Sequence, residues 1–239
     1  MIAAVATVLN EADIVGISIE HLLASGVSRV YVAHGPSTDG TLDILHSFGD
    51  DVMVVPDHYS FHDQPTRTAE LANLAAIDGA EWVLPFDADE FPYIPDVTDL
   101  AEAFAGILAG INKLIIQRWM HTDWEHRYVQ SERLPKVAWR TDRPFVCHPG
   151  NHDVTIETDG ICGGLMMREI QFRSFEHMVR KSRERIARID PSFGPQYGTH
   201  QRRLAALSGA ALEEAWADLM AVPTVVDPIP VRRRSDAHV

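Results

Sequence analysis

Asp87 and Asp89 are two carboxylates separated by one residue, directly after an apolar run that ends at Phe86. Side chains at positions i and i+2 beyond the end of a strand can converge on one cation, and carboxylate oxygens suit Mg²⁺ or Mn²⁺. Such a metal binds substrate phosphates in turn. The pair therefore predicts a site for a divalent metal and a diphosphate, although Asp-x-Asp is also common in ordinary loops.

Two further polar clusters follow apolar runs earlier in the chain. Asn10 and Glu11 come after the run from Ile2, and Asp39 lies in the Ser-Thr-Asp-Gly-Thr stretch that follows residues 29–33. In open parallel sheets, ligands bind beyond the carboxyl ends of the strands. The three clusters are therefore expected to share one site at that edge.

The elements that would position these residues alternate regularly over the first hundred positions. Short apolar runs predict strands, and stretches with helical spacing, bounded by Asp, Thr and Gly, predict helices. We expect strands at 2–8, 29–33, 52–55 and 82–86, and helices at 14–24, 41–48 and 66–78. This order predicts an α/β fold with a mostly parallel sheet covered by helices on both faces.

The second half is less regular and predicts an α+β arrangement. Its expected strands are 113–119, 137–140 and 145–148, and its expected helices are 97–108, 175–189 and 204–220. We expect one domain over residues 1–220, with a donor-binding half at 1–95 and an acceptor half at 96–220. The Pro- and Arg-rich remainder, 221–239, is expected to be a loosely held tail.

Composition narrows the function. The chain has 239 residues, 46% of them hydrophobic, and a formal charge of -13, which argues against a nucleic-acid partner. Its two cysteines form no CxxC pair, and the apolar start lacks a basic leader. We expect a cytoplasmic protein without a transmembrane segment, in which any membrane attachment is peripheral, through a protein partner or the tail.

Several segments resemble the glycosyltransferase family 2-like proteins. The stretch WVLPFDADEF at 82–91 resembles their W-v-l-x-x-D-x-D-E-F segment, VATVLNEAD at 5–13 their opening strand and turn, and STDGT at 37–41 their nucleotide-binding loop. The stretch from Phe172 to Lys181 resembles y-R-S-x-e-q-x-x-r-K. The resemblance implies a GT-A-like (Rossmann-like) fold that moves a sugar from a nucleotide-sugar donor to a carbohydrate or other hydroxyl acceptor, with Mn²⁺ or Mg²⁺; a UDP-sugar is the family-level expectation.

The resemblance also implies roles for individual residues. The base and ribose pocket would be lined by Thr7, Leu9, Asn10 and Glu11. Asp39 would hydrogen-bond the base, although an Asp in this position also suits the N-terminus of the next helix. Arg67 would lie near the donor phosphates beside Asp87, or be a solvated residue at a helix start.

Further metal ligands are less clear. Relatives of this kind often carry a His just before the Phe172 stretch, where this chain has Glu169. A Glu still offers oxygen ligands, and the alternative is a salt bridge to a nearby Arg. His152 is expected to ligate the metal or to orient Asp153.

An inverting transfer needs a base for the acceptor hydroxyl. Asp153, in the Gly-Asn-His-Asp stretch at 150–153, is the preferred candidate and Asp123 the second; a turn with structural Asn and Asp is the alternative. Trp119, His121 and Trp124 suit an acceptor surface, or are buried aromatic residues.

Residues 168–188 hold seven basic and three acidic residues in an acidic chain. This excess either faces a phosphate-bearing ligand or forms the solvated side of a helix.

Other protein classes fit less well. Gly-Asn-His-Asp also occurs in metallophosphoesterases, but their Asp-x-His on the first strand is missing here. A nucleotidyltransferase should show a Gly-rich basic loop after the first strand. A noncatalytic nucleotide-sugar-binding homologue is the remaining alternative.

Overall fold

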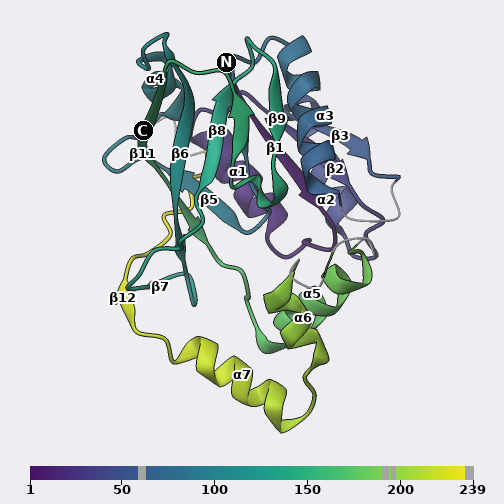
Figure 1. The fold of residues 1–239 in the computed structure, drawn as a ribbon. Coiled ribbons are helices and arrows are strands. Elements are labelled where there is room, and N and C mark those ends of the chain that lie inside the picture. Colours follow the sequence, from purple (N-terminus) through teal and green to yellow (C-terminus); the bar gives the residue numbers. More distant parts are fainter. Residues whose placement is uncertain (59–62, 190–193, 195–197, 235–239) are drawn as a thin grey trace.

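One eight-stranded sheet forms the centre of the molecule (Figure 1). The computed structural model describes residues 1–58, 63–189, 194 and 198–234. From edge to edge the strands are β3 (Val52–Pro56), β2 (Arg29–His34), β1 (Ile2–Val8), β4 (Trp82–Pro85), β8 (Lys136–Arg140), β6 (Ile111–Met120), β11 (Gly160–Glu169) and β5 (Glu90–Tyr93).

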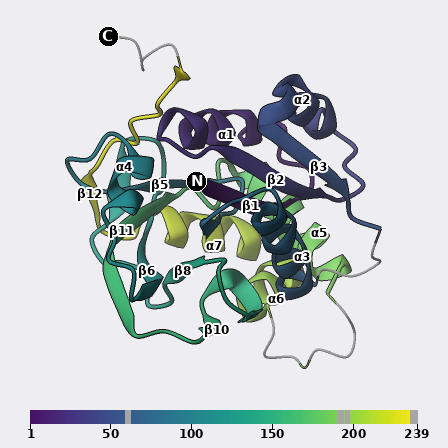
Figure 2. The same ribbon diagram turned by 90° about the horizontal axis from the view of Figure 1, so that it is seen from above.

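The first four of these strands are parallel, as predicted, and helices cover both of their faces (Figure 2). α1 (Val15–Ala24) and α2 (Thr41–Ser47) share a hydrophobic cluster with Ile2, Ala4 and Ala6 of β1. α3 (Gln64–Ile77) packs on the opposite face against Ala3 and Val5. Because alternate residues of a strand point to opposite faces, β1, apolar from Ile2 to Ala6, serves both cores.

The second half of the chain completes the same sheet. β8 lies antiparallel between β4 and β6, β6 runs parallel to β11, and β11 is antiparallel to β5. Besides three C-terminal helices, this half contains α4 (Leu100–Ala105), the 3-10 turn η2 (Pro149–Asn151), the pair β9 (Phe145–Cys147) and β10 (Val154–Ile156), and the pair β7 (His126–Tyr128) and β12 (Thr224–Val226). A second 3-10 turn, η1 (Gly49–Asp51), precedes β3 in the first half. The sheet therefore mixes parallel and antiparallel strands in its second half.

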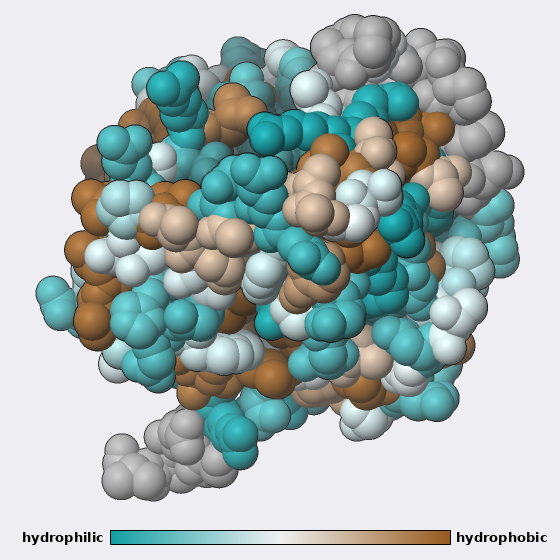
Figure 3. Space-filling model, turned by 90° about the horizontal axis from the view of Figure 1, so that it is seen from below, coloured by the Kyte–Doolittle hydropathy of each residue, from teal (hydrophilic) through white to brown (hydrophobic). Residues whose placement is uncertain are grey.

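Three helices follow the sheet and have a hydrophobic cluster of their own. They are α5 (Phe175–Ala187), α6 (Thr199–Ala206) and α7 (Ala210–Met220), and Phe172, Met178, Leu204 and Leu212 are buried among them. The single helix expected at 204–220 was wrong. Gly209 has φ +54°, a backbone conformation outside the α-helical range that suits Gly. The chain therefore turns between α6 and α7. On the face seen from below, hydrophilic and hydrophobic residues are interspersed (Figure 3).

The tail is also better ordered than expected over its described part, 221–234. β12 pairs with β7, and Ile229 is buried in the main hydrophobic cluster. The Arg232 guanidinium donates to the carbonyls of Val97 and Thr98. The loosely held arm was therefore a wrong prediction for these residues, while 235–239 lie outside the described chain.

None of the helices within the described residues combines the length and apolar content that a bilayer-spanning helix requires.

Candidate functional site

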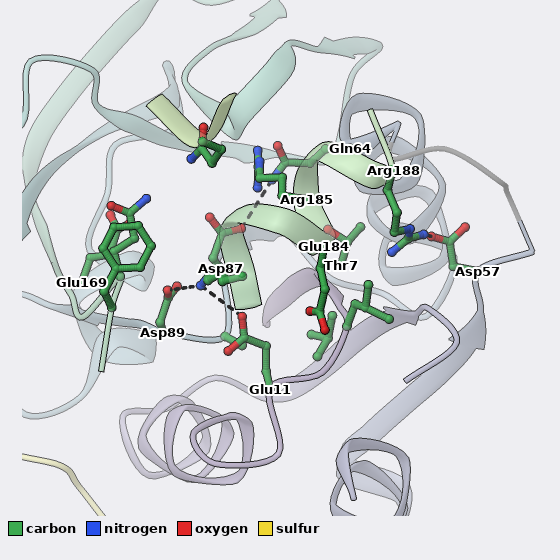
Figure 4. Close-up of a pocket in the computed structure, with 17 residues that line it drawn as sticks. Thr7, Glu11, Asp57, Gln64, Asp87, Asp89, Glu169, Glu184, Arg185 and Arg188 are labelled. Atoms are coloured by element: carbon green, nitrogen blue, oxygen red, sulfur yellow. Dashed lines mark hydrogen bonds and ion pairs between the residues drawn. The ribbon is translucent and has the colours of Figure 1, made fainter. Parts of the chain in front are cut away.

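A cavity opens at the carboxyl edge of the parallel strands, between that edge and α5 (Figure 4). Most of its lining comes from three parts of the chain. The end of β1 and the following loop contribute Thr7, Val8, Leu9 and Glu11; the loop after β4 contributes Asp87, Ala88 and Asp89; and α5 with its C-terminal residue contributes Lys181, Glu184, Arg185 and Arg188. The structure therefore places Glu11 of the Asn10–Glu11 cluster and the Asp87–Asp89 cluster around one space.

Asp89 lies at the floor of this cavity in a network of charges. Its carboxylate is 2.5 Å from the Lys181 ammonium, which is also 3.0 Å from the Glu11 carboxylate. Arg173 closes the network by donating to Glu11 and, at 2.6 Å, to Asp13. Burial raises the pKa of Asp89 to about 6 although Lys181 opposes the shift, since Glu11 and other carboxylates add to the effect of burial.

Asp87 has a different partner. Its carboxylate is 3.0 Å from the ammonium of Lys136, and the Gln64 amide donates to it at 3.4 Å. Burial alone would raise the pKa of Asp87, but Lys136 outweighs it and holds the pKa well below its usual range. Lys136 also contacts Glu90 at 2.5 Å, and burial raises the pKa of Glu90 to about 8 despite this contact.

Glu169 lines the cavity from the end of β11 and is buried. The Arg118 guanidinium donates to one of its oxygens through two nitrogens, one of them at 3.1 Å. This is the salt bridge that the sequence offered as the alternative to a metal ligand, although it is buried rather than at the surface. Arg118 lies on β6, so the pair also connects two neighbouring strands of the sheet.

Asp87, Asp89, His152 and Glu169 do not form a ready-made metal site within the described residues. The Nδ1 atom of His152 is 2.8 Å from the Pro135 carbonyl, which leaves Nε2 as its free ring nitrogen. Across the described residues, no three His, Cys, Asp or Glu side chains gather in a way that would hold a metal. Both Asp carboxylates are instead neutralised by lysines. The Mn²⁺ or Mg²⁺ predicted from the sequence therefore stays a prediction, and one that these contacts do not favour.

Asp39 lies outside the cavity and stabilises the loop beside it. Its carboxylate accepts from the backbone N–H groups of Ala12, at 3.1 Å, and Thr41, at 3.0 Å. Burial works to raise the pKa of Asp39, but the hydrogen bonds from Thr41 and Ala12 outweigh it and keep the pKa below its usual value. These contacts match the alternative at the start of a helix, while a contact with the base stays a prediction.

Asn10 connects this loop to α5. It adopts a left-handed backbone conformation with φ +53°. Its side chain accepts from the Thr38 N–H at 2.7 Å and donates to the Glu184 carboxylate at 3.0 Å, while Arg180 donates to its carbonyl at 2.9 Å. Asn10 thus orients the loop, rather than lining the cavity as Thr7 and Leu9 do.

Arg67 is directed at protein carboxylates. It is buried on α3 and pairs with Asp57 at 2.8 Å and with Glu70 at 3.1 Å. Asp57 in turn lines the cavity and contacts Arg188 at 3.4 Å. A direct contact of Arg67 with donor phosphates stays a prediction; in this structure it supports Asp57.

The Gly-Asn-His-Asp stretch packs against α3. Asn151 accepts from the Thr68 hydroxyl at 3.1 Å, and the Gly150 N–H donates to Gln64 at 3.0 Å. Asp153 lies outside the cavity and pairs with Lys113. The position of Asp153 therefore gives no support to its role as the base. Gln64, which the sequence did not assign to the site, links this stretch to Asp87.

The aromatic residues proposed for the acceptor lie away from the cavity. His121 is buried, and the Arg127 guanidinium lies 3.9 Å from the centre of the Trp119 ring. Trp124 meets Phe91 edge to face, with ring centres 5.5 Å apart. Trp119 and Trp124 therefore make contacts within the protein, and an acceptor surface here stays a prediction.

The sequence did not assign Lys136 or Arg185 to the site. The signal for Arg185 was present in the basic excess at 168–188. The apolar side of α5 packs against the protein and so fixes the orientation of the helix. Positions 181, 185 and 188 then fall on one face, which is the face that lines the cavity. Lys136 carried no such signal, because it is one Lys in a short strand and reaches Glu90 across 46 positions.

No protein-family model matches the chain, and no curated protein matches it. Among solved structures, TarS residues 1–349 from S. aureus, in complex with UDP, match 84% of this chain and 68% of theirs at 17% identity and TM-score 0.45. Glucosyl-3-phosphoglycerate synthase from Mycobacterium tuberculosis, with Mn²⁺ and UDP, matches 49% of this chain and 44% of its own at 19% identity and TM-score 0.35. Mannosyl-3-phosphoglycerate synthase from Rubrobacter xylanophilus matches 49% of this chain and 40% of its own, at 19% identity and TM-score 0.34.

The chain spans under half the length of both synthases and 41% of a longer TarS structure. At this extent of overlap we take neither activity nor ligand from them, and the function is argued from the residues of this chain.

Proposed function

We propose that this protein is a glycosyltransferase that moves a sugar from a nucleotide-sugar donor to an acceptor hydroxyl. One observation carries the proposal. Thr7, Leu9 and Glu11, which the family resemblance assigns to the base and ribose, line the same cavity as Asp87 and Asp89, which it assigns to the diphosphate. Residues some eighty positions apart thus surround one space at the sheet edge where α/β folds bind ligands.

The chemistry that this site would perform is a displacement at the anomeric carbon. The acceptor oxygen forms a bond to that carbon, the bond to the diphosphate oxygen breaks, and the nucleoside diphosphate leaves with the bonding electrons. Groups that neutralise the departing diphosphate lower the barrier, because negative charge develops there in the transition state. The hydroxyl proton passes to a base if the transfer inverts the anomeric centre.

The position of the base is not supported by a free carboxylate among the described residues of the cavity. Asp153 lies outside it and pairs with Lys113. Asp89 is ion-paired with Lys181 at 2.5 Å on the side assigned to the diphosphate, and Arg118 holds the Glu169 carboxylate. Asp153 therefore stays the predicted base of an inverting transfer.

Calorimetric titration with UDP, GDP and dTDP, with and without Mn²⁺, tests the donor site and identifies the nucleobase of the donor. We expect saturable binding of one of these nucleotides in the micromolar to millimolar range. Release of sugar from the matching nucleotide-sugar, followed by chromatography, then separates a transferase from a noncatalytic binder. A folded protein that binds none of the three nucleotides under either condition would exclude the proposal.

The metallophosphoesterase alternative has no structural support within the described residues. Its signature stretch is occupied by contacts to α3 and β6, and no group of metal-binding side chains surrounds it.

A further inference from the structure

Every carboxylate that lines the cavity has a basic partner in the protein. Glu11 pairs with Arg173 and Lys181, Asp57 with Arg67, Asp87 with Lys136, Asp89 with Lys181, Glu169 with Arg118 and Glu184 with Arg180. The cavity is lined by six acidic side chains, yet none of them is left to attract a cation without displacing a lysine or arginine.

Arg185 is the exception among the basic residues. It lines the cavity close enough to Asp87 to lower the pKa of that carboxyl, but among the described residues it has neither an ion-pair partner nor a side-chain hydrogen bond. Its Nε atom is buried with no acceptor. A guanidinium has five N–H donors and no acceptor capacity, and leaving them unsatisfied in a partly desolvated place is costly. Among the described residues, the Arg185 guanidinium therefore has no anionic partner.

The neighbours of Arg185 on the helix extend the same surface. Lys181 and Arg188 lie one turn before and about one turn after it, and both line the cavity. Figure 4 shows Arg185 and Arg188 at its wall. The Lys181 ammonium contacts Glu11 and Asp89, so one of its three N–H groups is still available. Arg188 contacts Asp57 at 3.4 Å, and Asp57 is already held at 2.8 Å by Arg67.

We propose that Arg185, assisted by Lys181 and Arg188, binds the diphosphate of the donor directly, in the place that the sequence predicted for a divalent metal. This inference rests on the proposed function for the identity of its ligand. A planar guanidinium donates two parallel hydrogen bonds to phosphate oxygens, and the three cations together match the two phosphates of a nucleoside diphosphate. The same cations would neutralise the diphosphate as it leaves.

The test compares two arginines of α5. Arg185→Gln removes the unpaired guanidinium, whereas Arg183→Gln removes an exposed arginine two positions earlier on the same helix. Calorimetry is carried out in EDTA with UDP, uridine and inorganic pyrophosphate. We expect wild type and Arg183→Gln to bind UDP and pyrophosphate without metal, and Arg185→Gln to lose at least about tenfold in affinity for both while uridine binding stays unchanged. Thermal unfolding verifies that both variants are folded.

Asp89→Asn separates this proposal from metal binding. The amide keeps the shape of the side chain but releases Lys181 and cannot act as a charged metal ligand. If the cations bind the diphosphate, this variant keeps or gains affinity for UDP in EDTA. UDP binding that requires Mn²⁺ and disappears in Asp89→Asn would overturn the inference and leave the proposed function intact.

The remaining outcomes are also distinct. Pyrophosphate binding that depends on Arg185, without binding of any nucleotide, would support the anion site and contradict the proposed function. Equal affinities of wild type and Arg185→Gln for pyrophosphate would overturn the inference whatever the nucleotides do.

Discussion

The ammonium group of Lys136 lies 2.5 Å from the Glu90 carboxylate, and both side chains are almost completely inaccessible to solvent. The same ammonium is 3.0 Å from Asp87, so a residue of β8 holds two of the three carboxylates that follow β4. Burying the charges of Lys136 and Glu90 costs several kcal/mol each unless they are paired. Lys136 therefore sets the shape of the Asp87 loop as well as its charge.

We expect Lys136→Met to lower the free energy of unfolding by about 3–5 kcal/mol, since it leaves buried carboxylates without their cation. Adding Glu90→Gln should recover part of that loss, because the double variant no longer buries the Glu90 charge. Urea denaturation measures both. Lys113→Met is the control: its partner Asp153 is more than half exposed, and exposed pairs contribute at most about 1 kcal/mol. Equal losses in the two single variants would contradict this account.

Asp39→Ala addresses the two roles considered for that carboxylate. If Asp39 binds the base, the variant weakens UDP binding and leaves pyrophosphate binding unchanged. Thr41→Val is the matched control, because the Thr41 hydroxyl bonds to Asp39 and supports the same loop without offering a carboxylate. We expect a larger loss of UDP affinity in Asp39→Ala than in Thr41→Val by calorimetry. Equal losses of UDP affinity would show that Asp39 acts only by stabilising the loop.

His21 should make stability depend on pH. Burial lowers the pKa of His21 to about 4 from its ordinary value of 6.5, although a hydrogen bond with the Pro92 carbonyl opposes the shift. Between these pH values the unfolded chain binds a proton that the folded protein excludes. The contribution is therefore fully present above pH 6.5 and is lost as the pH falls toward 4, by up to about 1.4 kcal/mol per pH unit.

The geometry around His21 explains this exclusion and supplies the test. The Arg232 N–H donates to Nδ1 at 3.3 Å, so Nδ1 must stay unprotonated while Nε2 faces the Pro92 carbonyl at 3.0 Å. We expect the stability of wild type to fall more steeply than that of His21→Gln between pH 6.5 and 4, measured by urea denaturation at several pH values. Identical slopes would contradict the prediction.

Ile229 tests whether the C-terminal segment belongs to the core. It is 7% exposed in the main hydrophobic cluster, whereas Val226, three residues earlier, is 73% exposed. Ile229→Ala should lower the free energy of unfolding by about 2–4 kcal/mol, and Val226→Ala by less than about 0.5 kcal/mol. A neutral Ile229→Ala would show that the segment contributes little to stability.

The sequence predicted best what is encoded locally. β1 is apolar except for Thr7, and β4 is an apolar run that is followed closely by Asp87 and Asp89. Both strands and the acidic pair can therefore be found without knowing any long-range contact. β11 escaped prediction because Gly163 and Gly164 interrupt its pattern and its first half is largely exposed. Its pairing with β6 is a property of the assembled sheet.

The partners of the acidic residues were harder to predict for the same reason. Lys181 reaches Asp89 across 92 positions, and Lys136 reaches Glu90 across 46. A motif shows that carboxylates are present, but which cations neutralise them depends on how distant strands and helices meet. The expectation of a metal was made from the carboxylates alone, without these partners, and it stays a prediction.

The place of β8 in the sheet has a consequence for how the chain folds. β4, which presents Asp87, pairs with β1 on one side and with β8 on the other, and Trp139 of β8 packs into the cluster beneath α3. A chain ending near residue 95 would leave β4 as an open edge, free to pair with other molecules. During synthesis, β4 therefore gains its second neighbouring strand only after β8, which ends at residue 140, has been made. Such long-range pairing slows folding. We expect the isolated first half to aggregate instead of binding nucleotide.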